Sequence, residues 1–285
     1  MNRNQKTIGR EGSVSGIGIH SGQTATVLLK PAAAGSGIQF FKNGARLRFS
    51  LSDDRDVSAS ADGKVNLRCS SVGQEDLRIL TVEHLLAALC GLEITNIEIH
   101  VDGAEVPGLD GSALPFVKLL KSLGIVEQAA VRDVYRISEP IFCYGPHSAI
   151  SVYPDERFSV AYTMDYDHPQ LRNQRVDFTL DADLFENEIA PARTFCTENE
   201  ALELKKRGFG RGADYGNTLV ISQKGVAGNR LRFPDECARH KVLDILGDLN
   251  LLGFSIVGRV VGLRSGHALN QKLVEEIKKQ KRAYE

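Results

Sequence analysis

Three side chains that could do chemistry recur at every fourth position late in the chain. His240, Asp244 and Asp248 follow one another between Arg239 and Leu249. On a helix, residues four apart have Cβ atoms about 5–6 Å apart, so an imidazole and a carboxylate on successive turns can reach one point. A helix can supply two ligands to a metal ion in this way. The alternative interpretation is a solvated outer face that carries two acids and a base.

A third candidate ligand, His84, lies far from the other two in the sequence. Two imidazoles and one carboxylate form a common catalytic zinc set, with the fourth position left for water. The positive charge that remains on such a metal lowers the pKa of bound water to about 7. His84, His240 and Asp244 are therefore candidate zinc ligands. The alternative is that both histidines are ordinary core or surface residues.

Two other side chains could transfer protons. Glu83 adjoins His84, and a carboxylate beside a ligand can accept a proton from metal-bound water, as in H-E-x-x-H enzymes. His267, when protonated, could stabilise an oxyanion or protonate a leaving amine. Asp248 could orient that imidazole and stabilise its charge. The alternatives are a first-turn helix acid, a capping or surface histidine, and a solvated acid.

The helices that position these residues can be predicted from apolar spacing and from breaks. Asp235 could cap the helix that contains the second histidine, and Gly253 ends it before a β-like stretch. Thr81 could cap the helix that contains the first histidine, and Gly91 closes it. We therefore expect two helices that each carry part of one site.

The order of elements repeats. After the first helix come an apolar strand at 97–101, a glycine-rich turn and a helix at 115–123. After the second come a strand at 255–263, a Ser-Gly-His-Ala turn and a helix at 269–280. This repetition predicts two copies of one α+β unit, each a sheet backed by two helices. Their equivalent helices would meet, with the active site between them.

The polar segment 127–133 is the predicted linker between these halves. The first α+β domain would span 1–126 and hold Glu83 and His84. The second would span 134–285 and hold the remaining half of the site.

Composition limits the classes of function. Hydrophobic residues make up 42% of the 285 positions and charged residues 25%, which is typical of a globular protein. A net charge of −1 gives no basic field for nucleic acid. We expect no signal peptide and no transmembrane segment, because no apolar run approaches the roughly 20 residues that span a bilayer. Five scattered cysteines predict reduced thiols in the cytoplasm.

Several motifs together resemble UDP-3-O-acyl-N-acetylglucosamine deacetylase, the zinc amidase at the committed step of lipid A synthesis. The resemblance begins at Gly16-Ile17-Gly18-Ile19-His20-Ser21-Gly22 and continues to the last helix. Five further motifs follow in the expected order: Thr81-Val82-Glu83-His84-Leu85, Asp110-Gly111-Ser112, Ala192-Arg193-Thr194-Phe195, Arg239-His240-Lys241-Val242-Leu243-Asp244 and Ser265-Gly266-His267-Ala268-Leu269-Asn270.

The resemblance implies a role for each candidate. His84, His240 and Asp244 would hold zinc. Glu83 would be the general base, and His267 the cationic general acid supported by Asp248. Thr194 and Lys241 would lie near the oxyanion of the tetrahedral intermediate.

The resemblance also implies substrate contacts. An insert at about 186–222 would build a hydrophobic passage for the acyl chain, with Phe195 beside the sugar. Asp165 and Tyr166 would meet the nucleotide and Arg264 the diphosphate, although Tyr166 could be plain core and Arg264 a loop charge. Glu200 matches an acidic position near the nucleotide, and it is equally a capping-box partner of Thr197.

The expected function is therefore a zinc hydrolase of lipid metabolism that removes acetate from an acylated UDP-sugar. The expected partner is that small molecule, and the protein is expected to be a monomer. Two alternatives remain open: a zinc amidase for another N-acetyl nucleotide-sugar, and an inactive relative that only binds a nucleotide-sugar.

Overall fold

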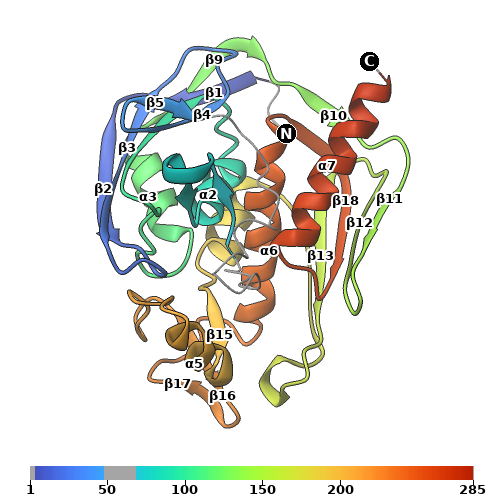
Figure 1. Cartoon of the computed structure of the whole chain (residues 1–285). Coiled ribbons are helices and arrows are strands. Elements are labelled where there is room, and N and C mark those ends of the chain that lie inside the picture. The colour runs from blue at the N-terminus through green and yellow to red at the C-terminus, as the bar shows by residue number, and fades with distance from the viewer. Residues whose placement is uncertain (1–3, 48–68, 285) are drawn as a thin grey trace.

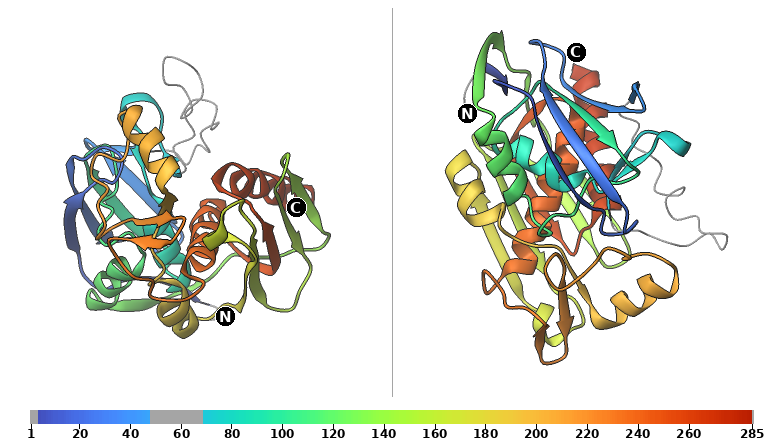
Figure 2. Two further views of the ribbon diagram at one scale, coloured as in Figure 1. Left: turned by 90° about the horizontal axis from the view of Figure 1, so that it is seen from below. Right: turned by 90° about the vertical axis from the view of Figure 1, so that its left-hand side faces the viewer.

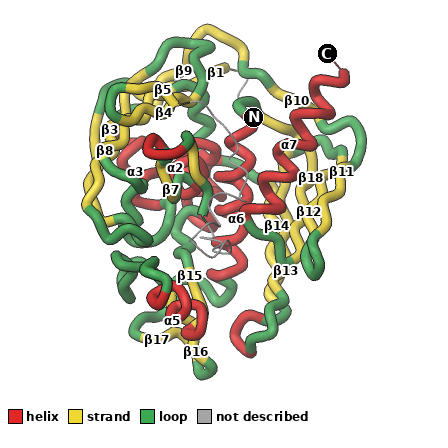
Figure 3. Tube along the Cα trace, viewed as in Figure 1, coloured by secondary structure: helices red, strands yellow, loops and turns green. Residues whose placement is uncertain are grey.

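Two sheets lie on opposite sides of a central layer of helices (Figures 1 and 2). This arrangement comes from a computed structural model that describes residues 4–47 and 69–284. Helices and strands both occur in each half of the chain, which confirms the predicted α+β class (Figure 3). Within the described residues, no helix has the length and apolar character needed to cross a membrane.

The first sheet has five strands in the order β2-β3-β8-β4-β5. Neighbouring strands are antiparallel except for the parallel pair β4 and β8. Alternate side chains of β3, such as Val27 and Leu29, are fully buried beneath the helices. The elements of this half are β2 (Gly12–Ile17), β3 (Thr24–Pro31), β4 (Ile38–Lys42), β5 (Ala45–Leu47), α2 (Glu83–Gly91), β8 (Ile97–Asp102) and α3 (Leu114–Ser122).

The second sheet contains the path β11-β12-β18-β13-β14, with β10 paired to β18. Its pairs along this path are antiparallel except for the parallel pair β13 and β18. The strand predicted at 255–263 is confirmed with the same bounds. The elements are β10 (Val134–Arg136), β11 (Ile141–Tyr144), β12 (Ala149–Tyr153), β13 (Phe158–Met164), β14 (Gln174–Thr179), α6 (Glu236–Leu249), β18 (Ser255–Leu263) and α7 (His267–Tyr284).

Helices α2 and α6 pack directly against each other and join the two halves. Gly247 makes this close approach possible, because a Cβ atom there would lie 2.2 Å from the carbonyl oxygen of Glu83. The three candidate metal ligands and Glu83 therefore lie on the two helices that meet at the centre of the molecule.

The predicted linker at 127–133 is not a free connection. Strand β9 (Ile125–Val131) occupies most of it and pairs antiparallel with β1 (Asn4–Ile8). The partners are more than a hundred residues apart, so local polarity in the sequence gave no sign of the pairing.

Between β14 and α6 the chain adds a small unit that packs on the main core through Phe185 and Ile189. It contains α4 (Ala182–Leu184), a π-helical turn (Phe185–Ile189), β15 (Phe195–Thr197), α5 (Glu198–Lys206), β16 (Leu219–Ser222) and β17 (Gly225–Ala227). The capping box at the start of α5 is confirmed, because Thr197 and Glu200 exchange side-chain and backbone hydrogen bonds. The three-stranded sheet of this unit extends past 222, to Ala227.

One predicted helix cap, Thr81, is wrong, and the other, Asp235, is confirmed in position but makes no capping bond. Thr81 has a φ of 58° and donates its hydroxyl to Glu105, so Val82 occupies the cap position of α2. Asp235 precedes α6 but makes no side-chain cap bond, because its carboxylate accepts from Arg239 Nε at 2.5 Å. Gly253, with a φ of 80°, ends the following 3₁₀ turn Asn250–Leu252 as expected.

Candidate metal centre and active site

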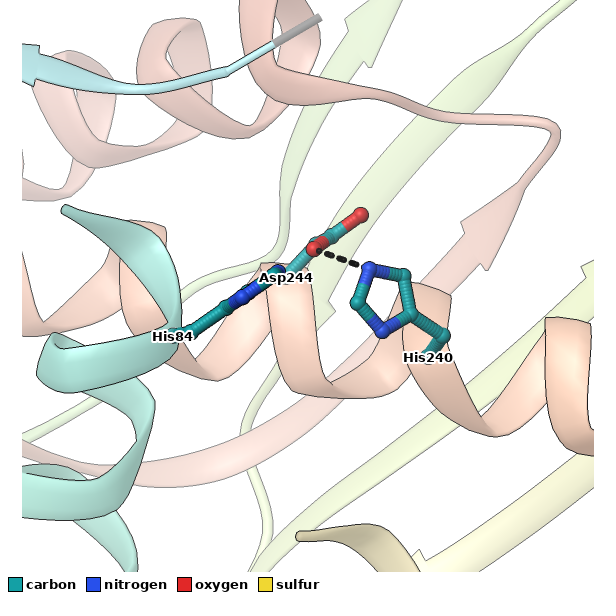
Figure 4. A group of neighbouring side chains, drawn as sticks. All are labelled: His84, His240 and Asp244. Carbon is teal, nitrogen blue, oxygen red and sulfur yellow. Dashed lines mark ion pairs between the residues drawn. The ribbon is translucent and has the colours of Figure 1, made fainter. Parts of the chain in front are cut away.

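The three proposed ligands converge. His84 extends from α2, and His240 and Asp244 extend from successive turns of α6 (Figure 4). One ligand atom from each lies within 4.8 Å of the others. All three side chains are 3% exposed, so the alternative of a solvated helix face is wrong.

The donor atoms suit a divalent cation. Oδ1 of Asp244 is buried, has no hydrogen-bond partner among the described residues, and lies 3.3 Å from Nε2 of His240. Ligands about 2.0–2.2 Å from a tetrahedral zinc lie about 3.3–3.5 Å from one another, so this pair is already at that spacing. Nδ1 of His240 lies 3.0 Å from the carbonyl oxygen of Ala192. A proton on Nδ1 donates to that carbonyl and leaves the Nε2 lone pair for a metal.

The protonation states also suit a metal site. Burial and the neighbouring His240 lower the pKa of His84 to about 3, so its imidazole is neutral at pH 7. Burial also lowers the pKa of His240. Burial alone would raise the pKa of Asp244, but Lys241 and His240 outweigh it and hold the carboxylate ionised. Neutral imidazoles and an ionised carboxylate are the forms that bind metal.

Glu83 lies beside this cluster as a buried carboxylate. Its Oε2 accepts the backbone N–H of Ser70 at 3.0 Å, and its Oε1 lies 3.9 Å from Nε2 of His267. Burial raises the pKa of Glu83 to about 8, against the opposing charge of His267. A carboxylate with a raised pKa is suited to accept a proton near neutral pH.

His267 is the first residue of α7, and its imidazole is held as a cation. Its Nδ1 lies 2.8 Å from Oδ2 of Asp248, which is fully buried. Burial alone lowers the pKa of His267, but Asp248 and Asp244 outweigh it and raise the pKa to about 10. Nε2 lies 3.9 Å from both Glu83 and Asp244, so the charged ring faces the candidate metal centre.

A cavity of about 890 Å³ opens beside these groups. Thr194, Phe195 and Lys241 line it next to the candidate ligands, and the Phe195 ring centroid lies 6.3 Å from that of His240. Nζ of Lys241 donates to Oδ2 of Asp244 at 2.5 Å. Helix α5 of the small unit contributes further lining residues, and strand β16 contributes Val220.

A second, polar cavity of about 590 Å³ adjoins the first, and Tyr166 and Arg264 line both. The Arg264 guanidinium carbon lies 5.9 Å from the Tyr166 ring centroid. Glu200 lines the polar cavity and is also the capping-box partner of Thr197 at the start of α5. Asp165 is exposed and lines neither of these two cavities.

Two residues at the site received no role from the sequence. His20 lines the large cavity, and its Nδ1 is buried with no hydrogen-bond partner among the described residues. Its backbone N–H donates to the fully buried Glu105 at 3.0 Å. Ser70 bonds both Glu83 and Asp248. The Gly-Ile-His-Ser-Gly motif could have indicated His20, but Ser70 follows a polar stretch without periodicity.

Comparison with known proteins identifies the family of the chain. The profile of the family described as UDP-3-O-acyl N-acetylglycosamine deacetylase matches residues 5–279. The UDP-3-O-acyl-N-acetylglucosamine deacetylase of Anaeromyxobacter sp. (strain Fw109-5) is 41% identical over 276 residues, which cover 96% of this chain and 88% of that protein. The enzyme of the same name from Myxococcus xanthus is 36% identical, with 99% and 88% covered. That from Saccharophagus degradans is 38% identical, with 99% and 92% covered. The chain therefore belongs to the UDP-3-O-acyl N-acetylglycosamine deacetylase family.

Proposed function

We propose that this protein hydrolyses the N-acetyl group of a UDP-3-O-acyl-N-acetylglucosamine and releases acetate, the committed step of lipid A biosynthesis. The observation that carries the proposal is the convergence of His84, His240 and Asp244 beside Glu83 and His267 at the wall of one cavity. Family membership supports the choice of substrate.

The three ligands suit zinc, which when bound would acidify water and polarise the acetamide carbonyl. Glu83 accepts the proton of the attacking water. His267 and Lys241 stabilise the negative charge that develops on the carbonyl oxygen, and Thr194 donates its hydroxyl there. His267 then protonates the nitrogen of the leaving amine, because an amine anion is too basic to depart at pH 7. Asp248 keeps the imidazole oriented and charged.

The two cavities match the two ends of the proposed substrate. The large cavity includes apolar side chains such as Phe195, Leu202 and Val220, which suit an acyl chain. The polar cavity includes Tyr166 and Arg264, which suit a uracil ring and a diphosphate.

The proposal includes an origin of the fold by duplication, with domains at 1–126 and 134–285. The support is topological: the orders β2-β3-β8-β4-β5 and β11-β12-β18-β13-β14 each place their one parallel pair at the same position. A cytoplasmic location is also part of the proposal, supported by five cysteines that form no disulfide bond in the part of the chain that the structure describes. A monomer completes it, because both groups that transfer protons and all three ligands come from one chain.

A deacetylation assay tests the function directly. Purified protein is incubated with the acylated UDP-sugar and with its non-acylated counterpart, each with and without a chelator. We expect acetate release from the acylated substrate and loss of release with chelator. Faster turnover of the non-acylated sugar would favour an amidase of different specificity. No turnover of either, with stoichiometric binding, would favour a binding protein.

A further inference from the structure

Ser70 contacts both groups that are proposed to move protons. Its backbone N–H donates to Oε2 of Glu83 at 3.0 Å, and its hydroxyl donates to Oδ1 of Asp248. We propose that Ser70 is a positioning residue that aligns the general base and the general acid with each other. This inference rests on the proposed roles of Glu83 and His267.

The direction of the Ser70 hydroxyl bond is fixed by its surroundings. Nε2 of Gln271 donates to Oγ of Ser70 at 3.2 Å, and Nδ1 of His267 lies 3.2 Å from the same oxygen. Both of these nitrogens approach as donors, because Nδ1 of His267 carries the proton that also reaches Asp248. The hydroxyl proton is therefore directed at Oδ1 of Asp248.

The Ser70 bond completes the set that holds the Asp248 carboxylate. Oδ2 accepts from Nδ1 of His267 and from Nδ2 of Asn270, each at 2.8 Å, while Oδ1 accepts from Ser70. Asp248 is fully buried, so no solvent can replace a lost donor easily. With donors on both oxygens, the carboxylate plane is fixed, and the imidazole that it holds is fixed with it.

On the side of the base, the backbone bond of Ser70 fixes which oxygen is available. Because Oε2 of Glu83 is bonded to Ser70, Oε1 is the atom that faces His267, at 3.9 Å. Ser70, a residue of the N-terminal half, thus links Glu83 on α2 to Asp248 on α6. Asp248 in turn holds His267 on α7. This explains how the two halves keep a common geometry at the site.

The two bonds can be separated by substitution. Ser70→Ala removes the hydroxyl bond to Asp248 and keeps the backbone bond to Glu83. Because a hydrogen bond to a charged group is lost, we expect kcat to fall about 10–100-fold. KM should stay within about twofold, since Ser70 is fully buried and does not line the large cavity. Thermal stability and metal content are measured on the same preparation.

A double-mutant cycle shows whether the effect passes through Asp248. In an Asp248→Ala background, Ser70→Ala should reduce kcat by less than about threefold, since residues in one network are strongly non-additive. Equal effects of Ser70→Ala in both backgrounds would overturn the inference. If Ser70→Ala does not fold, Gln271→Leu removes the donor that directs the hydroxyl, and a fall in kcat with unchanged KM is expected there as well. An unchanged kcat in Ser70→Ala would also overturn the inference. If Ser70→Ala does not fold, an unchanged kcat in Gln271→Leu would do so.

Ser159→Ala is the matched control, because this serine is 3% exposed and lies on β13, 3.4 Å from Nη1 of Arg259. It should leave kcat unchanged.

A failure of the inference about Ser70 can be told apart from a failure of the proposed function. Wild-type turnover together with inactivity of Glu83→Ala establishes the function, and a wild-type kcat in Ser70→Ala then rejects the role of Ser70 alone.

Discussion

The backbone of Gly247 in α6 lies against that of Glu83 in α2, so closely that a Cβ on the glycine would be 2.2 Å from the Glu83 carbonyl oxygen. The contact therefore joins the two helices at the residue that is proposed as the general base. Backbone cannot move aside as a flexible side chain can. The spacing of the catalytic groups thus depends on the absence of one side chain.

Gly247→Ala should separate the two helices. In an unobstructed helix this change stabilises by about 0.5–1 kcal/mol. Here overpacking outweighs that gain, at a cost of about 1–3 kcal/mol. We expect a lower thermal midpoint together with reduced turnover, measured by calorimetry and by the deacetylation assay. A higher midpoint with full activity would show that the helices do not approach this closely.

Loss of any proposed ligand should remove the metal. His84→Ala, His240→Ala and Asp244→Ala each leave two ligands, which are too few for a stable site. Metal analysis of purified protein should give stoichiometric zinc for the wild type and almost none for these variants. His100→Ala is the control, because this histidine on β8 pairs with Glu98 and stacks on Phe41, away from the site. Retention of metal by two of the three ligand variants would place the site elsewhere.

Glu83→Ala should separate proton transfer from metal binding. The carboxylate is bonded by Ser70 and does not belong to the converging ligand set, so the metal should stay. A positioned base contributes about 10²–10⁴ in rate, and we expect kcat to fall by that factor. Turnover and zinc content are measured together. Metal loss in this variant would indicate a ligand role instead.

The buried pair of Glu236 and Arg193 should prove important for both stability and metal affinity. Glu236 is fully buried and accepts from the Arg193 backbone N–H and from its Nε, at 3.0 and 2.8 Å. Glu236→Ala leaves that guanidinium unpaired, which costs about 3–5 kcal/mol of unfolding free energy. The carbonyl of the preceding Ala192 orients His240, so zinc affinity should fall about 10–100-fold.

Chemical denaturation and zinc competition measure these two effects. Glu203→Ala is the control, because it breaks only an exposed pair with Lys206 on α5 and should change neither quantity. Unchanged zinc affinity in a folded Glu236→Ala protein would mean that the Ala192 carbonyl is held by other contacts.

The parts of this structure that sequence predicted best depend on local spacing. The i, i+4 relation of His240 and Asp244 and the capping box of Thr197 and Glu200 each lie within one or two helical turns. The repeated order of elements made His84 a third candidate ligand, and the family resemblance then assigned all three residues to one zinc site. The site geometry agrees with that grouping.

The failures have a common physical cause, which is competition from partners that are distant in sequence. Thr81 has the right side chain for a cap, but Glu105, 24 residues later, takes its hydroxyl. Segment 127–133 is polar enough for a linker, yet β1 pairs with its first part to form a sheet. Ser70 meets Asp248 across 178 residues, which no local pattern could indicate.

The pH dependence of kcat/KM should be bell-shaped. The pKa of Glu83 sets the acid limb and the pKa of His267 sets the alkaline limb. Activity falls at low pH as Glu83 gains a proton and at high pH as His267 loses one. Without metal their pKa values are about 8 and about 10. A bound divalent cation lowers both, because positive charge favours each deprotonated form, so the optimum should lie below that window.

Asp248→Asn should move the alkaline limb more than the acid limb, because Asp248 is the largest charge that acts on the pKa of His267 and only a minor one for Glu83. The charge of Asp248 is the largest influence that raises the pKa of His267 against burial, and asparagine keeps the shape without the charge. His267 should then lose its proton at lower pH, so the alkaline limb shifts to the acid side and the optimum narrows. Asp177→Asn, which disrupts only a pair with Arg259 at the sheet surface, should leave both limbs in place. The pH profiles are recorded with saturating zinc, so that activity lost through metal release is not mistaken for the titration of Glu83 or His267. An unmoved alkaline limb in Asp248→Asn would show that a group other than His267 donates the proton to the leaving amine.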